Sequence, residues 1–149
     1  YWFPKLHGTL DGLGDLIGVP LYAVGTTGFD QYVAKLDEGE EAIEEEFVDM
    51  GFRRNPVACF KSLPDGRDSE GSWVLLHEDA PDFVAPGMQL HVTMYERKDR
   101  QPGRELYAHY EDDWRVAPLA HLRAKNLSVT AGVEIAHDYF DQKSFLVLN

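Results

Sequence analysis

Two segments near the middle of the chain carry chemically capable side chains at alternate positions. Residues 88–97 and 104–111 each alternate apolar and polar side chains, with a turn at residues 101–103 between them. This alternation predicts an antiparallel hairpin whose polar side chains share one face, while the apolar ones face a core. The polar face would carry His91, Thr93, Tyr95, Tyr107, His109 and Glu111.

These side chains offer hydroxyl, imidazole and carboxyl groups to a ligand. As a working register we pair Tyr95 with Tyr107, which places His91 opposite Glu111. Such a surface would suit the floor of a small-molecule pocket, and it could also offer a general acid or base, or metal ligands. The competing interpretation is an exposed sheet face on which Thr and Tyr serve strand propensity alone. We assign no catalytic residue.

Metal and cofactor sites are not predicted. The histidines form no HExxH pattern, and the chain has no CxxC, GxGxxG or GK[ST] motif. His109, Glu111 and Asp113 would share a face if the strand continued, but ordinary surface polarity explains that spacing. We therefore expect no metal ion and no cofactor.

The charge of the chain limits its partners. The 149 residues carry a formal charge of −12, which disfavours binding to nucleic acids and anionic membranes because both are polyanions. No apolar run approaches the ~20 residues that a membrane helix needs. The single cysteine, Cys59, cannot form an internal disulfide. We expect a cytoplasmic protein that binds neither nucleic acid nor membrane.

Most of the excess negative charge lies in residues 37–49. This segment is predicted to belong to an amphipathic helix that ends at Gly51. Ile43, Phe47 and Met50 recur at helical spacing and form its apolar stripe. Its outward acidic side chains include Glu41, Glu44, Glu45 and Asp49. A solvated outer face is one interpretation. A docking surface for another protein, with a basic partner favoured by charge, is the other.

A basic group surrounds the loop of the 88–111 hairpin. It consists of Arg97, Lys98, Arg100 and Arg104. This group is either a solvated loop tip or a contact for phosphate or an acidic partner. A homodimer would form if the loop of one copy met the acidic helix of another.

The order of the elements predicts an α+β fold. We expect a mostly antiparallel sheet built from two hairpins, with two or three helices packed on one face and residues 1–149 forming a single domain. The first hairpin would join residues 57–63 to residues 72–77. A helix is predicted to begin at Thr27, and residues 129–140 fit either a helix or a strand.

Two function hypotheses follow. The first is a non-enzymatic binding or regulatory protein that acts through protein–protein contact, using the acidic helix. The alternative is a small-molecule-binding domain or small enzyme with its pocket on the face of the 88–111 hairpin.

Overall fold

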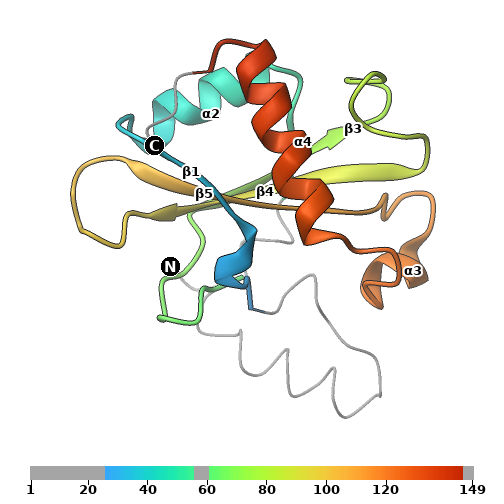
Figure 1. Cartoon of the computed structure of the whole chain (residues 1–149), viewed down its shortest axis with the longest axis horizontal. Coiled ribbons are helices and arrows are strands. Elements are labelled where there is room, and N and C mark those ends of the chain that lie inside the picture. Colours follow the sequence, from blue (N-terminus) through green and yellow to red (C-terminus); the bar gives the residue numbers. More distant parts are fainter. Residues whose placement is uncertain (1–25, 56–60, 146–149) are drawn as a thin grey trace.

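Five antiparallel strands form one sheet in the order β1-β5-β4-β3-β2 (Figure 1). The computed structural model of the protein describes residues 26–55 and 61–145. The strands are β1 (Tyr32–Leu36), β2 (Arg53–Arg54), β3 (Gly71–Leu76), β4 (Met88–Glu96) and β5 (Arg104–Asp112). The long strands β4 and β5 form the centre of the sheet, as their regular alternation predicts.

Two helices cover one face of the sheet. These are α2 (Glu40–Asp49) and α4 (Val129–Gln142), seen above the strands in Figure 1. The short helix α3 (Pro118–Leu122) lies near the far end of β5, and a single 3-10 turn, η3 (Phe29–Gln31), precedes β1. The predicted α+β class is therefore confirmed.

The core between the helices and the sheet is aromatic. Phe47 of α2 is fully buried, and its ring lies 4.9 Å from the ring of Phe52 and 5.0 Å from that of Trp73. On α4, the ring of Phe140 stacks parallel to that of Phe47 at 6.0 Å. The apolar face of β4 and β5 completes the core through residues that include Leu90. The apolar stripe predicted for the acidic helix, α2, therefore faces the sheet.

Helix α4 lies directly against the backbone of β5. Its N-cap is Ser128, whose side chain accepts a hydrogen bond from the N–H of Ala131 at 3.1 Å. At Gly132 a Cβ atom would lie 2.3 Å from Cα of His109, so no larger residue fits without movement. The missing side chain therefore sets the distance between helix and strand. Residues 129–140, which fit either structure in sequence, belong to this helix.

The helix predicted to begin at Thr27 is wrong. Only η3 forms there, and from Tyr32 onward the chain extends to pair with β5. This pairing buries Val33 and Leu36, and Tyr and Val both favour strands. Contacts with a distant strand therefore override the helical spacing.

The first predicted hairpin is also wrong in its pairing. β3 forms where residues 72–77 predict a strand, but its neighbours are β4 and β2. Residues 56–60 lie outside the described residues. Ser62 makes only isolated bridges, to Thr26 and Asp68. The described end of the segment contacts the polar face of the sheet, where Leu63 is buried.

Candidate functional site

The face of β4 and β5 opposite the two helices is polar and buried. All six side chains predicted to share a face do so, and none is more than 3% exposed. They are His91, Thr93, Tyr95, Tyr107, His109 and Glu111. Side chains from residues 27–31 and 61–67 contact this face. The burial contradicts the interpretation of the face as a solvated surface.

The register that pairs Tyr95 with Tyr107 is wrong by two positions. In the structure His91 lies opposite His109. All of residues 97–103 belong to the loop, so the hairpin closes earlier than the alternation suggests. Because a slip of two positions is even, every side chain stays on its predicted face.

Glu111 is the centre of a compact polar group. Its Oε1 lies 3.0 Å from Nδ1 of His91, and its Oε2 lies 3.1 Å from Nε2 of His109. Donor atoms of the three side chains, one from each, all lie within 4.8 Å of one another. Gln89 donates from Nε2 to the Oε1 of Glu111 at 2.9 Å. We call these three ligand-type side chains the His–His–Glu group.

The far side of each imidazole is held by a neighbouring side chain. His91 Nε2 is hydrogen-bonded to the hydroxyl of Ser72 on β3. His109 Nδ1 donates to Oε1 of Gln31 at 2.8 Å. An amide oxygen can only accept, so this hydrogen bond places a proton on Nδ1 of His109. The other ring nitrogen of each imidazole faces Glu111.

Burial governs the charges of this group. Burial lowers the pKa of His109 to about 3, and burial also lowers the pKa of His91. Burial alone would raise the pKa of Glu111, but His109 and His91 hold it well below its ordinary value. Burial lowers the pKa of the nearby Lys61 to about 8, and Glu111 opposes that shift. The group therefore contains two neutral imidazoles and one ionised carboxylate.

The hydroxyl of Ser72, the ring of His91 and the carboxylate of Glu111 form a hydrogen-bonded chain. The same order of groups activates the nucleophile of serine hydrolases. Here the serine is only 1% exposed, and its Oγ also lies 3.4 Å from the carbonyl oxygen of Val92. We therefore assign the hydroxyl to orienting the ring rather than to attack on a substrate.

The two tyrosines lie at the other end of the polar face. Tyr95 donates to Oγ1 of Thr27 at 2.8 Å, and Tyr107 donates to Oε1 of Glu105 at 2.9 Å. Their rings meet edge to face with centroids 5.3 Å apart. Thr93 lies opposite Tyr107. The predicted set is thus divided between the His–His–Glu group and this tyrosine pair.

Two other polar residues near Glu111 have separate roles. Asp113, which would share its face in a longer strand, lies beyond the end of β5 and pairs with Arg115 at 2.9 Å. His121 Nδ1 lies 3.6 Å from Oε2 of Glu111, but it hydrogen-bonds to the carbonyl oxygen of Asp112 at 2.9 Å. Neither residue joins the His–His–Glu group.

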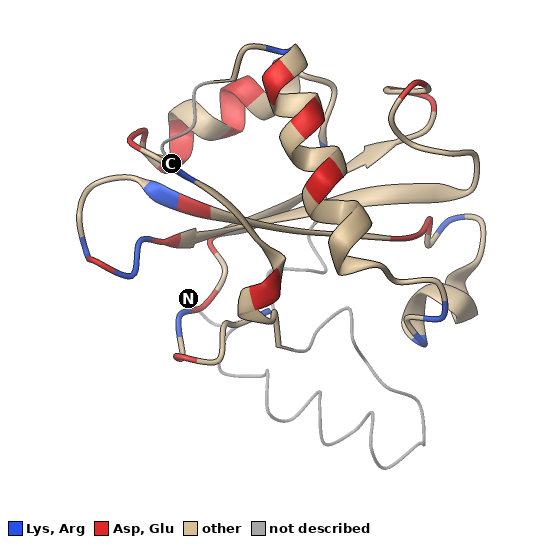
Figure 2. Ribbon diagram, in the orientation of Figure 1, with Lys and Arg blue, Asp and Glu red and all other residues tan. Residues whose placement is uncertain are grey.

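The predicted protein-contact residues lie along α2, where acidic residues recur along the ribbon (Figure 2). They are Glu41, Glu44, Glu45 and Asp49, and they line a shallow hollow of about 530 Å³. Glu44 is partly buried and pairs with Arg54 at 2.8 Å. Val48, which is 67% exposed, lies among them. The surface is therefore acidic and includes one exposed apolar side chain.

Sequence reasoning missed several members of the polar face. These are Gln31, Lys61, Ser72, Gln89 and Glu105. Gln89 and Glu105 continue the alternation of β4 and β5, so the pattern that found the others also contains them. The remaining three come from separate segments, and no shared motif connects them.

Comparison with known proteins gives no relative. No protein-family model matches the chain, and no curated protein or solved structure matches it significantly. None of the helices in the described ranges combines the length and hydropathy needed to span a bilayer.

Proposed function

We propose that this protein binds a divalent transition-metal ion through His91, His109 and Glu111. The observation that carries the proposal is the convergence of three buried ligand-type side chains, whose donor atoms all lie within 4.8 Å of one another. Nε2 of His109 lies 3.1 Å from Oε2 of Glu111, and Nδ1 of His91 lies 3.0 Å from Oε1. Neutral imidazole and ionised carboxylate are common ligands of transition-metal ions.

Two distances in the His–His–Glu group match the spacing of ligand atoms around a metal ion. Metal bonds to imidazole nitrogen and carboxylate oxygen are about 2.0–2.2 Å long. For bond angles of roughly 90° to 109°, neighbouring ligand atoms then lie about 3.0–3.4 Å apart. The nitrogen–oxygen distances are 3.0 Å from His91 to Oε1 and 3.1 Å from His109 to Oε2, and the donor atoms of the three side chains lie within 4.8 Å of one another. Two imidazoles with one carboxylate also form the donor set of hydrolytic zinc sites and of non-haem iron sites.

The surrounding residues support the same assignment. A metal-binding histidine usually donates from its other ring nitrogen to an oxygen atom, which orients the ring. Gln31 already accepts such a bond from His109. Ser72 is placed to accept one from His91, if that ring binds the ion through Nδ1. Gln89 holds the carboxylate.

The burial of an ionised carboxylate favours a functional role over a purely structural one. Replacement of a buried ionic group by apolar side chains is often neutral or stabilising, so stability alone does not account for it. Three protein ligands also leave a coordination position open for water or a small molecule. A bound ion would act there as a Lewis acid. This proposal departs from the sequence-based expectation of no metal ion, and it develops the small-molecule alternative of the sequence analysis.

Metal analysis of the purified chain tests the proposal. Protein treated with a chelator is titrated with Zn²⁺ and with Co²⁺, and the bound metal is counted by elemental mass spectrometry. We expect one ion per chain and, for Co²⁺, visible absorption of an ordered site. At a Zn²⁺ concentration 100 times the Kd, the free energy of unfolding should rise by about 2.7 kcal/mol.

Matched variants locate the ion. His109→Gln and Glu111→Gln should lower the affinity by roughly 100-fold or more, because loss of an outer partner alone costs about 10- to 100-fold. His137→Gln, at an exposed position of α4, is the control and should bind as the wild type does. Circular dichroism confirms that each variant folds. The proposal is wrong if the wild type binds no stoichiometric metal, since hydrogen bonds among the three side chains would then account for the group.

Protein contact through α2 is the second candidate function. It is favoured by the exposure of Val48, an apolar side chain surrounded by acidic ones. A basic partner would bind there with a strong dependence on salt. Replacing Glu41 and Glu45 with Gln should weaken capture of such a partner and reduce the salt dependence. Native mass spectrometry at low salt tests the homodimer, and a monomer under those conditions excludes it.

A further inference from the structure

Basic residues gather around the loop between β4 and β5 of this acidic molecule (Figure 2). Together with Asp65 and Glu96 they line a hollow of about 760 Å³, which we call the basic hollow. The basic side chains are Arg67, Arg97, Lys98, Arg100 and Arg104. Asp99, Glu70 and Glu105, which lie outside this lining, also bind three of these arginines. The attraction of the hollow for a small anion therefore depends on the cations that form no ion pair.

The cations of the basic hollow are of two kinds. Arg67 and Arg97 each pair with a carboxylate two residues away, at 2.9 and 2.7 Å, and their side chains are only 16% and 12% exposed. Arg104 is also paired, with Glu70. Lys98 and Arg100 differ, because neither forms an ion pair with any other described residue. Their charges are therefore available to a ligand.

A second hollow of about 370 Å³ adjoins the first and has aromatic walls. The two hollows share Arg67 and Lys98. The second adds the rings of Phe29 and Tyr32, which are 45% and 36% exposed. Nζ of Lys98 lies 5.6 Å from the centroid of the Phe29 ring, and the Tyr32 ring stands edge-on to that of Tyr107 at 5.7 Å. Exposed rings in this setting offer a surface on which a flat aromatic group stacks.

We propose that the two adjoining hollows bind a nucleoside phosphate. The base would stack on Phe29 and Tyr32, and the phosphate would lie against Lys98 and Arg100. An aromatic wall suits any flat ring, and a wall of lysine and arginine suits phosphate, so a ligand that carries both uses both hollows. The second hollow alone has the volume of a small-molecule site. This site is separate from the His–His–Glu group, and it does not depend on metal binding.

Calorimetry with a set of related probes tests the two halves of the site. Chelator-treated protein is titrated with AMP, ATP, adenosine, pyrophosphate and inorganic phosphate at low ionic strength. We expect AMP and ATP to bind, and adenosine and inorganic phosphate to bind at least 10-fold more weakly than AMP. Saturation-transfer NMR should show magnetisation passing from the protein to the adenine protons.

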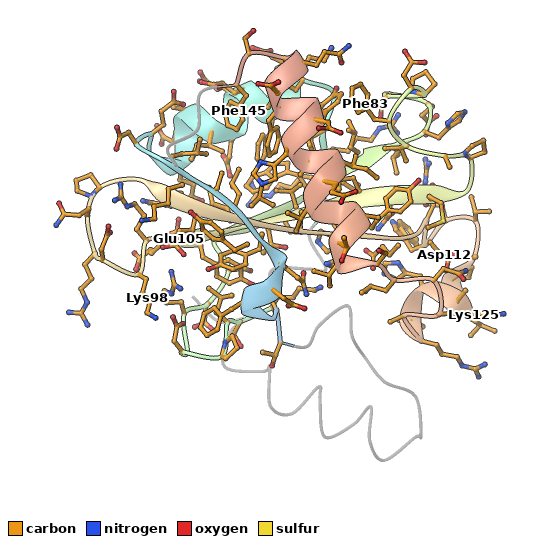
Figure 3. All side chains as sticks on the ribbon, viewed as in Figure 1. Phe83, Lys98, Glu105, Asp112, Lys125 and Phe145 are labelled. Atoms are coloured by element: carbon orange, nitrogen blue, oxygen red, sulfur yellow. The ribbon has the colours of Figure 1, made fainter. Side chains whose placement is uncertain are left out.

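Variants separate a specific site from a general charge effect. Lys98→Gln with Arg100→Gln should lower ATP affinity about 10-fold or more, and Tyr32→Leu should lower AMP affinity but not the affinity for pyrophosphate. The control is Arg123→Gln with Lys125→Gln, which removes the same charge at the opposite end of the sheet, where Figure 3 labels Lys125. The control should bind as the wild type does. Absence of nucleotide binding, an equal loss in the control, or pyrophosphate binding as tight as that of ATP would each overturn the proposal.

Discussion

Replacing Gly132 with alanine tests whether the contact between α4 and β5 positions His109. In the structure a Cβ atom at this position would lie 2.3 Å from Cα of His109 and 2.6 Å from the backbone nitrogen of Tyr110. Unbonded carbon atoms pack at about 3.5–4.0 Å. The helix would therefore have to move away from the strand by more than about 1 Å.

Two opposing effects decide the sign of the result. In an ordinary helix interior, alanine is more favourable than glycine by about 1 kcal/mol. Overpacking costs about 1–3 kcal/mol, and here the obstructing atoms are backbone atoms, which cannot rotate away. Movement of α4 would also loosen the packing of Ala136 and Phe140 against the sheet. We expect a net loss of about 2 kcal/mol or more in the free energy of unfolding.

Urea denaturation followed by circular dichroism measures this change. Gly39→Ala is the control, because no atom lies within 4 Å of a Cβ at that position. The control should change the free energy of unfolding by less than about 1 kcal/mol. If Gly132→Ala is as stable as the wild type, the close contact between α4 and β5 does not exist as described. A metal affinity lowered in Gly132→Ala but not in Gly39→Ala would connect the contact to His109.

Three further outcomes are expected. Phe47→Ala should lower the free energy of unfolding by about 3–5 kcal/mol in urea titrations, because a fully buried ring among aromatic neighbours is lost; a change below about 1 kcal/mol would contradict the described core. Burial would raise the pKa of Glu105, but the N–H of Lys98 and the guanidinium of Arg67 outweigh it and hold the pKa below 4.5. The stability from this carboxylate is therefore complete above pH 4.5 and is lost as the pH falls through the folded pKa. Glu105→Gln should therefore make the free energy of unfolding depend less on pH on the acid side. An unchanged slope would exclude the effect. Gln31→Ala should lower Zn²⁺ affinity about 10- to 100-fold without changing the stoichiometry, and an unchanged affinity would show that Gln31 does not support the site.

The faces of the central strands were predictable, while their register was not. Alternation along β4 and β5 depends only on each strand, so it places His91 and His109 on one face before any pairing is known. The register depends on how many residues the loop takes, and residues 97–103 contain no motif that sets this number. The length of that loop therefore sets the cross-strand pairing of the two histidines. The His–His–Glu group depends on this pairing.

The edge strand and the outer partners of the site were beyond sequence reasoning for a different reason. Residues 32–36 have helical spacing, and only pairing with a strand far along the chain makes them extended. Gln31 and Ser72 are ordinary polar residues in sequence. They become partners of His109 and His91 because the fold brings four separate segments to one face.

The strand order also has a consequence for synthesis on the ribosome. The first strand, β1, pairs with β5, and the hydrogen bond from His109 to Gln31 spans 78 positions of the chain. At about 5–20 residues per second, translation of that span takes roughly 4–16 s. During this interval β1 has been made but its partner has not, so an unpaired edge stays open to other chains. The polar face closes only after residue 111 has emerged, which makes completion of the site one of the last events in folding of the nascent chain.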